Sequence, residues 1–455
     1  MDQSKRHIAV LPFPFASHSL SIFTLARMIS KSAPDVNISY ISTSRSIASV
    51  FKGSDAVGID NIKPFTIRDG LPEGYKPSRN PTEPIALFLN VARDSFREGI
   101  QKAESERGVK ISCLLSDAFV YFAADIAEDL KVPWVAFWGA APISIAIHYH
   151  TDNILEKLAC NESGGKEVTT LDFIPGPSGI TKDDLPTEVV TYGKSDDVMS
   201  SLLYEMGKQL KRAAAIVINS FEEMDQEITN YLISTFSLYL NVGPFTLLTS
   251  SNSSVSASSD DTSGCLTWLS SQEPSSVAYV SFGSVIVPPP HEIVAIAEAL
   301  EESKVPFLWS FRGDPSQLLP QGFSERTVNR GKITAWAPQV DVLSHASVGA
   351  FVTHGGWNSV VETITGGVPM ICRPFFGDQK LNRKLMQDIW GIGTGVEGDG
   401  ITKDGMVNAL RKVLLEEEGK RMREKITCLK KLSVEACEAQ GSSMKCFKQL
   451  VDLLI

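Results

Sequence analysis

Short apolar runs alternate with amphipathic stretches along the first part of the chain. The apolar runs predict strands and the amphipathic stretches predict helices. Alternation of this kind is typical of a parallel sheet that is covered by helices on both faces. The predicted strands cover residues 8–15, 37–43, 62–67, 111–116 and 134–138, and helices cover 19–31, 82–107 and 120–130.

The alternation then lapses until a polar tract of low complexity, residues 249–264, which predicts a linker or mobile loop. A second series follows, and the tail 402–455 carries helical apolar spacing. Its predicted strands cover residues 277–282, 307–311, 332–335, 350–353 and 370–373, and its helices cover 291–303, 340–345, 359–365 and 380–390.

The whole pattern predicts an α/β chain with two Rossmann-like, doubly wound domains that face each other across a cleft. With 455 residues, the chain is too long for one ordinary core, which also favours two domains. We expect a first domain at 1–245, a linker at 246–264, a second domain at 265–435 and a final helix at 436–455 that packs back toward the first domain.

The net charge of −10 argues against nucleic acid or an anionic membrane as a partner. It leaves open a local anion site made of backbone N–H groups. The seven cysteines are scattered and show no metal-ligand spacing, so we expect a reduced, cytoplasmic protein. The longest uncharged run, 132–149, contains two prolines and predicts a buried strand leading into a loop rather than a membrane span.

The most informative segment is the stretch from Trp336 to Gln379. Within it, a predicted strand runs into the turn His354-Gly355-Gly356, and a helix follows from about Asn358–Ser359. Ligands of open α/β sheets bind beyond the carboxyl ends of strands, and helix N-termini attract phosphate. The segment therefore predicts a nucleotide-diphosphate site.

A purely structural interpretation of the same residues exists. Ser359 and Glu362 have the spacing of a helix capping box, and Gly366-Gly367 is an ordinary helix stop. The strand–turn–helix context and the aromatic Trp336, which fits no core periodicity, favour the ligand site.

Two polar residues of the first domain suit acid–base chemistry. His18 and Asp117 each come just past a predicted strand, and parallel strands open on one crevice at their carboxyl ends. A neutral imidazole can take a hydroxyl proton while a carboxylate fixes its tautomer. The alternative is that His18 is a structural residue with its hydrogen bonds satisfied.

The stretch from Trp336 to Gln379 resembles, over its full length of 44 residues, the signature of plant family 1 UDP-sugar-dependent glycosyltransferases, which have the GT-B fold. The resemblance implies that Trp336 stacks on uracil, that Ala337 bonds the base edge, and that Gln339 and Glu362 hold the ribose. It assigns the diphosphate to Ser284, His354, Asn358 and Ser359, and the sugar to Trp357, Asp378 and Gln379. Gly355 replaces the family's usual Cys, at a position that serves backbone approach.

The same resemblance makes His18 and Asp117 the catalytic pair of an inverting transfer, in which an acceptor hydroxyl attacks the anomeric carbon of an α-linked UDP-sugar and gives a β-glycoside. No cofactor is implied beyond the UDP-sugar co-substrate, and the absence of any Asp-x-Asp argues against a metal-dependent clamp. We expect a monomer.

Further segments, including HIAVLPFPFASH and SDAFVYFAADIAEDL, resemble flavonoid 3-O-glucosyltransferases in particular. This implies a flavonol or anthocyanidin acceptor, attacked at its 3-hydroxyl. The expected acceptor residues are Phe15, Ser17, Thr82, Phe119, His148 and Phe376.

The donor sugar is less clearly indicated. Gly139 stands where hexose-using relatives commonly carry Thr or Ser, and Thr82 stands where a Gln often meets the acceptor. Gln379 favours glucose over galactose. Glucose is the expected sugar, while another UDP-sugar, or another phenolic or terpenoid acceptor, stays open.

Two functions of other classes are alternatives. The glycine-rich run from Gly391 to Gly395 would suit a nucleotide-cofactor oxidoreductase, but it is not G-x-G-x-x-G and comes late in the chain. A non-catalytic small-molecule binding protein is the second alternative, and the presence of both His18 and Asp117 argues against it.

Overall fold

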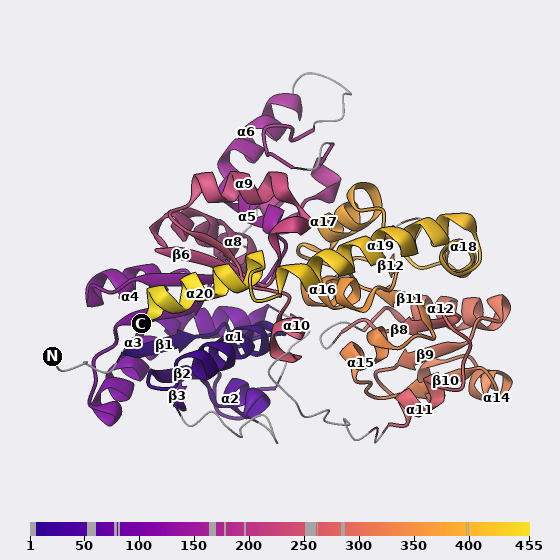
Figure 1. Ribbon diagram of the computed structural model, residues 1–455, viewed down its shortest axis with the longest axis horizontal. Helices are drawn as coiled ribbons and strands as arrows, with labels where there is room; N and C mark the ends of the chain where they lie inside the picture. Colours follow the sequence, from indigo (N-terminus) through magenta and orange to yellow (C-terminus); the bar gives the residue numbers. More distant parts are fainter. Residues whose placement is uncertain are drawn as a thin grey trace. The chain divides into compact units, whose positions relative to one another are not determined.

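A computed structural model describes residues 6–51, 61–76, 80, 82–162, 170–176, 179–194, 197–250, 261, 263–283, 287–396, 398 and 400–455. It divides into two compact units, each built on one parallel sheet (Figure 1). The first unit contains Met1–Gly176, Thr187–Phe245 and Ala439–Ile455, and the second contains Pro177–Pro186 and Thr246–Glu438. Most of the predicted polar tract, and the predicted site residue Ser284, lie outside the described residues.

The sheet of the first unit has seven parallel strands in the order β3-β2-β1-β4-β5-β6-β7. The order reverses between β1 and β4, which makes this the switch point of a doubly wound sheet. The strands are β1 His7–Leu11, β2 Asn37–Thr43, β3 Ile62–Ile67, β4 Cys113–Asp117, β5 Trp134–Trp138, β6 Ala215–Ile218 and β7 Tyr239–Asn241.

Three features of the first unit differ from the sequence prediction. Strand β1 ends at Leu11, because Pro12 and Pro14 have no N–H to donate to a neighbouring strand. Strands β6 and β7 were not predicted; they are only four and three residues long. The helices α5–α9 also lie where the pattern was expected to lapse.

Within the residues that the structure describes, ten α-helices belong to the first unit. The C-terminal helix α20 is one of them: it packs on β7, and its first residue, Ser442, donates a hydrogen bond to Glu223. The helices are α1 His18–Ser32, α2 Ser44–Val50, α3 Glu83–Arg107, α4 Ala123–Leu130, α5 Pro142–Tyr149, α6 Thr151–Glu162, α7 Thr187–Thr191, α8 Val198–Gln209, α9 Gln226–Thr235 and α20 Ser442–Leu454.

The sheet of the second unit has six parallel strands in the order β10-β9-β8-β11-β12-β13. Its switch point lies between β8 and β11. The last three residues of the glycine-rich run, Gly393–Gly395, form the edge strand β13, which pairs with β12. The strands are β8 Val277–Val280, β9 Phe307–Ser310, β10 Gly331–Thr334, β11 Val348–Thr353, β12 Met370–Cys372 and β13 Gly393–Gly395.

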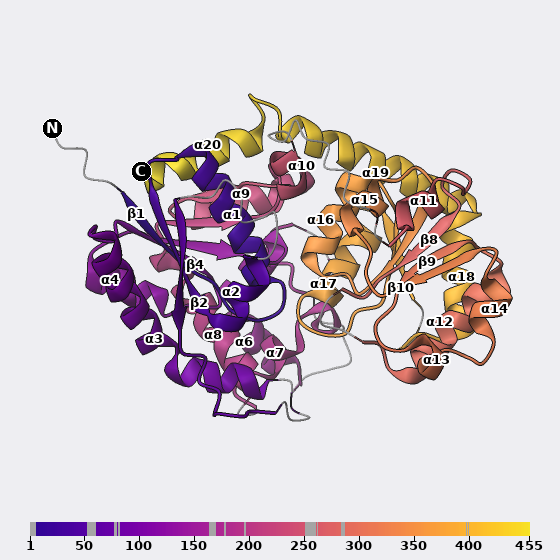
Figure 2. The same cartoon turned by 90° about the horizontal axis from the view of Figure 1, so that it is seen from below.

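The helices of the second unit pack in groups, as Figure 2 shows: α11, α15 and α16 form one, and α12, α13 and α14 form another, with the strands between them. The helices are α10 Phe245–Ser250, which starts at the end of the first unit, α11 Cys265–Leu269, α12 Pro290–Ser303, α13 Pro315–Leu318, α14 Phe323–Thr327, α15 Gln339–Ser344, α16 Trp357–Gly366, α17 Gln379–Lys384, α18 Lys403–Leu414 and α19 Glu417–Ala436. Within the described part of the chain, no helix has the length and apolar character of a membrane span.

Candidate active site

His18 and Asp117 meet at the switch point of the first sheet. Strands β1 and β4 pair in parallel, with Leu11 opposite Ser116, so the residues that follow them lie at the same edge. Asp117 is the last residue of β4, and His18 is the first residue of α1 after the loop that leaves β1. Chain topology thus brings together two side chains that are 99 residues apart in sequence.

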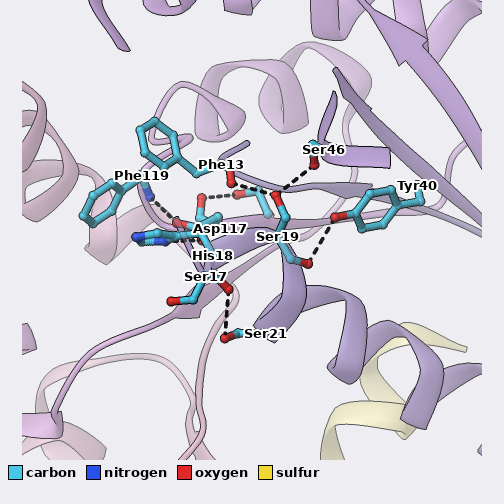
Figure 3. Close-up of polar contacts among 10 residues, drawn as sticks. Phe13, Ser17, His18, Ser19, Ser21, Tyr40, Ser46, Asp117 and Phe119 are labelled. Carbon is cyan, nitrogen blue, oxygen red and sulfur yellow. Dashed lines mark hydrogen bonds and ion pairs between the residues drawn. The ribbon is translucent and has the colours of Figure 1, made fainter. Parts of the chain in front are cut away.

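The two side chains form a hydrogen-bonded pair (Figure 3). His18 Nδ1 lies 2.8 Å from Asp117 Oδ2, and the other carboxylate oxygen accepts a hydrogen bond of 2.9 Å from the Phe119 N–H. Since a carboxylate only accepts hydrogen bonds, Nδ1 carries the proton, and a neutral ring then has its lone pair on Nε2. Asp117 is 1% exposed and the His18 side chain 21%, so the carboxylate is held inside while the imidazole reaches the surface.

Aromatic rings surround His18. The Phe119 ring centroid lies 4.6 Å from that of His18, and Phe13 lies 5.4 Å away in an edge-on arrangement. Phe15 and Phe88 extend this set, since Phe15 packs on both Phe13 and Phe88. Phe13 and Phe88 are buried and support the partly exposed rings of Phe15 and Phe119, which present an apolar aromatic face beside a base-type side chain. Sequence analysis singled out Phe15 and Phe119 but missed Phe13 and Phe88.

The loop before His18 is held by a buried polar network that sequence analysis did not find. Ser19 donates to the Phe13 carbonyl at 3.2 Å and lies 2.8 Å from the Ser46 hydroxyl, while the Tyr40 hydroxyl donates to the Ser19 carbonyl (Figure 3). Ala16 has φ of 51°, in the left-handed region that non-glycine residues rarely adopt. These bonds keep a strained loop in place directly before His18.

The other expected acceptor residues of this unit are spread more widely. His148, on α5, is buried, and its ring lies 5.6 Å from Trp138. Burial lowers the pKa of His148 to about 4, so the ring is neutral, and its Nδ1 has no partner among the described residues. Thr82 is the N-cap residue of α3 and donates to Asn80, and Ser17 is exposed beside His18.

The turn His354-Gly355-Gly356 lies at the switch point of the second sheet, after β11. The His354 ring is packed between two glycines: a Cβ at Gly283 would lie 2.9 Å from its Cε1 atom, and a Cβ at Gly356 would lie 2.5 Å from its Nε2 atom. Burial lowers the pKa of His354 to about 4. The ring is therefore neutral near pH 7 and can donate one N–H to an anion without carrying a charge.

Helix α16 begins at Trp357 with Gly356 as its N-cap. Ser359 is thus already inside the first turn, and the Ser359–Glu362 spacing is not a capping box. Instead, Gln339 Nε2 donates to Ser359 Oγ at 3.2 Å and to Glu362 Oε2 at 2.7 Å. Burial raises the pKa of Glu362, while its bond to Gln339 lowers it by a smaller amount. The three side chains form one polar cluster beside the helix start.

The aromatic residues of the predicted donor site differ in exposure. Trp336 is 63% exposed, the behaviour of a ring that is available for stacking, whereas Ala337 next to it is buried. Trp357 is only 3% exposed and packs near Trp390, so its side chain is part of the core. Asn358 is half-buried at the second position of α16.

The remaining predicted residues lie in the loop after β12 and at the first position of α17. Gln379 is 4% exposed, and its Oε1 accepts hydrogen bonds from the N–H groups of Phe375 and Phe376 at 2.8 and 3.3 Å. The Gln379 side chain therefore has only its NH2 group to offer a ligand. Asp378 is half-buried and bonded to Asn382, and the Phe376 side chain is 53% exposed.

No group of three or more His, Cys, Asp or Glu side chains is arranged to hold a metal ion in the described parts of the chain.

The chain is similar over nearly its whole length to known glycosyltransferases. The family model described as UDP-glucoronosyl and UDP-glucosyl transferase matches residues 81–433. A flavonol 3-O-glucosyltransferase of Actinidia chinensis var. chinensis is 44% identical over 454 residues, covering 100% of this chain and 98% of the relative. An anthocyanidin 3-O-galactosyltransferase of Rhododendron delavayi is also 44% identical, covering 99% of this chain and 97% of the relative.

Among solved structures, a UDP-glucose:anthocyanidin 3-O-glucosyltransferase in complex with UDP superposes with a TM-score of 0.90. It is 40% identical, and the match covers 99% of both chains.

Proposed function

Because the chain belongs to the family of UDP-glucosyl and UDP-glucuronosyl transferases, we propose that it transfers glucose from UDP-glucose to the 3-hydroxyl of a flavonol or anthocyanidin. The product is a β-glycoside, formed with inversion. The observation that carries this proposal is the hydrogen bond of 2.8 Å between His18 and Asp117 at the edge of an aromatic surface. The first unit binds the acceptor and the second binds the donor.

In the proposed reaction, His18 Nε2 takes the proton of the acceptor hydroxyl. The oxygen attacks the anomeric carbon, the bond from that carbon to the diphosphate breaks, and UDP leaves with the bonding electrons. Asp117 stabilises the imidazolium that forms and keeps the proton of Nδ1 in place. The His18 ring needs no rearrangement for this step, because Asp117 and the Phe119 N–H already fix the pair.

The nucleotide is proposed to bind along Trp336, Gln339 and the start of α16. Exposure of Trp336 supports a stacking role toward uracil, and the Gln339–Glu362 pair offers polar atoms for the two ribose hydroxyls. Neutral His354, with Asn358 and Ser359 at the N-terminus of an α-helix of ten residues, supports binding of the diphosphate. Ser284 is proposed to join them.

The sugar is the least constrained part of the proposal. Gln379 would donate through its NH2 group to sugar hydroxyls, with Asp378 accepting from them. A Cβ at Gly139 would lie 3.7 Å from His18 Nδ1, so this residue is directly beside the reacting group and leaves space there. The identity of 44% to a galactosyltransferase favours UDP-galactose as the second candidate donor.

The acceptor is proposed to lie against Phe15 and Phe119, with the polar edge of its ring system near Ser17 and His18. His148 is proposed to bond a distant ring hydroxyl, because its buried Nδ1 has no partner among the described residues. Thr82 and Phe376 are proposed to border the same ligand. The scattered cysteines, which show no metal-ligand spacing, support action in the reducing cytoplasm; we expect a monomer.

A donor panel tests the proposal directly. UDP-glucose, UDP-galactose, UDP-xylose, UDP-arabinose and UDP-rhamnose are each offered with quercetin, and the linkage and anomeric configuration of the products are determined by NMR. We expect the highest kcat/KM with UDP-glucose and a β-linkage at the 3-hydroxyl. Gly139→Thr should raise the preference for hexose over pentose donors. No UDP release with any phenolic acceptor, or an α-linked product, would overturn the proposal.

A further inference from the structure

Asn382 is a buried amide that none of the roles above uses. It lies on α17, one helical turn after Asp378, and it is 1% exposed. Residues four apart on a helix lie on the same face, so Asn382 and Asp378 are neighbours by helical geometry alone.

The Asn382 side chain links two parts of the proposed donor site. Its Nδ2 donates to the Gly355 carbonyl at 2.9 Å and to Asp378 Oδ2 at 2.9 Å. Both partners are pure acceptors, so the amide has only one orientation that satisfies them. The oxygen, Oδ1, is buried and has no hydrogen-bond partner among the described residues.

A buried acceptor without a partner lowers the stability of the fold. Leu at this position would remove the unsatisfied oxygen, but it would leave the Gly355 carbonyl and Asp378 Oδ2 without this donor. The chain thus carries an amide whose two donors hold site elements and whose acceptor is left unsatisfied. This combination is expected where a residue serves the geometry of a site rather than the stability of the fold.

We infer that Asn382 is a positioning residue that fixes both the diphosphate-binding turn and the sugar-facing carboxylate, an inference that rests on the proposed function of Gly355-Gly356 and Asp378. Gly355 has φ of 77°, and its carbonyl is tied to Asn382. Because the peptide is planar and trans, the N–H of Gly356 must point the opposite way from that carbonyl. Asn382 therefore orients a backbone donor at the start of α16 and one oxygen of Asp378 at the same time.

The experiment uses three variants of the full-length chain. Asn382→Leu removes both donors and the unsatisfied oxygen, Asn382→Asp replaces the donors with an acceptor, and Asn241→Leu is the matched control. Asn241 is also buried, at 2% exposed, but lies on β7 and accepts a hydrogen bond from Tyr239. For each, the thermal midpoint, the dissociation constant of UDP by calorimetry and kcat/KM for UDP-glucose with quercetin are measured.

At a temperature where Asn382→Leu is fully folded, we expect it to bind UDP about 5- to 20-fold more weakly than the parent and to lose roughly 100-fold or more in kcat/KM. Asn382→Asp should lose more near neutral pH and regain part of the loss as the pH falls, because a protonated carboxyl can again donate. In Asn241→Leu, the UDP affinity and kcat/KM of the folded protein should equal those of the parent.

Two outcomes would overturn the inference. One is an Asn382→Leu variant with the UDP affinity and kcat/KM of the parent. The other is a loss of UDP affinity and kcat/KM that disappears at temperatures where the variant is fully folded. The UDP measurement needs no acceptor and no turnover. If the parent makes no product, the proposed function fails, and the UDP affinities of the Asn382 variants still decide this inference.

Discussion

His18 Nδ1 lies 2.8 Å from Asp117 Oδ2, and the carboxylate is almost completely buried while the imidazole is partly exposed. The exposed ring can meet a substrate, and the buried carboxylate fixes the proton on the nitrogen that faces inward. In the proposed reaction, this arrangement separates the group that reacts from the group that orients it.

Asp117→Asn tests this division of roles. The amide can still bond the ring, but it can present an N–H to Nδ1 and so favour the wrong tautomer, and it cannot stabilise the imidazolium. We expect kcat to fall by about 10²- to 10⁴-fold, with UDP affinity unchanged. The control is Asp125→Asn, which removes a half-exposed carboxylate paired with Arg212 and should leave kcat within about twofold. Equal kcat in Asp117→Asn and the parent would contradict the assignment.

Trp336→Ala should weaken nucleotide binding without loss of stability. The ring is 63% exposed, so its removal leaves no cavity, while stacking on a base contributes about 1–3 kcal/mol. The dissociation constant of UDP, measured by calorimetry, should rise by roughly 5- to 150-fold, with Trp336→Phe in between. Leu415→Ala, at a site 68% exposed, is the control for loss of an exposed apolar side chain. UDP affinity that does not change in Trp336→Ala would exclude the stacking role.

Gly355→Ala should destabilise the second unit for two separate reasons. Its φ of 77° is unfavourable for any side chain, and a Cβ there would lie 2.5 Å from Cys372 Sγ. We expect a loss of roughly 2–4 kcal/mol in the free energy of unfolding.

Two further variants separate the cost of the positive φ at Gly355 from the cost of the clash with Cys372. Gly74→Ala has a similar φ of 71° with open space around the added Cβ, and should lose only about 1–2 kcal/mol. Cys372→Ala should make the Gly355→Ala change less costly, as shown by a double-mutant cycle in urea. The clash with Cys372 is refuted if Gly355→Ala and Gly74→Ala lose the same free energy.

The buried His148 predicts how stability depends on pH. Its pKa is about 4 in the folded chain, against 6.5 for an ordinary histidine. The unfolded chain therefore takes up a proton as the pH falls through 6.5, while the folded chain resists protonation until about pH 4. His148 supports the folded state above pH 6.5, and this contribution is lost between pH 6.5 and 4.

Urea unfolding of the parent and of His148→Gln between pH 7 and 4.5 measures the contribution of His148 to the free energy of unfolding. The free energy of unfolding of the parent should fall more steeply, by up to about 1.4 kcal/mol per pH unit below 6.5. Parallel curves for the two proteins would show that His148 does not titrate with a depressed pKa.

The fold was predictable because both sheets consist of buried apolar strands with helices between them, and the alternation of the two is visible in the sequence. Strands β6 and β7 escaped prediction because three or four residues carry too little periodicity to be distinguished from an apolar loop. The nearness of His18 and Asp117 followed from one rule, that parallel strands end at a common edge.

Contacts made through tertiary packing could not be foreseen. Ser359 and Glu362 have capping-box spacing, but only the structure shows that α16 begins at Trp357 and that Gln339 bonds both side chains. The i, i+4 relation of Asn382 to Asp378 was visible in the sequence, whereas its bond to Gly355 depends on how α17 packs beside the turn.

The most direct test of the central claim is UDP release with UDP-glucose and quercetin, comparing the parent with His18→Ala. General-base catalysis contributes about 10²–10⁴-fold, so release by the variant should fall by that factor while its affinity for UDP is retained. UDP release at an undiminished rate in His18→Ala would show that His18 is not the base.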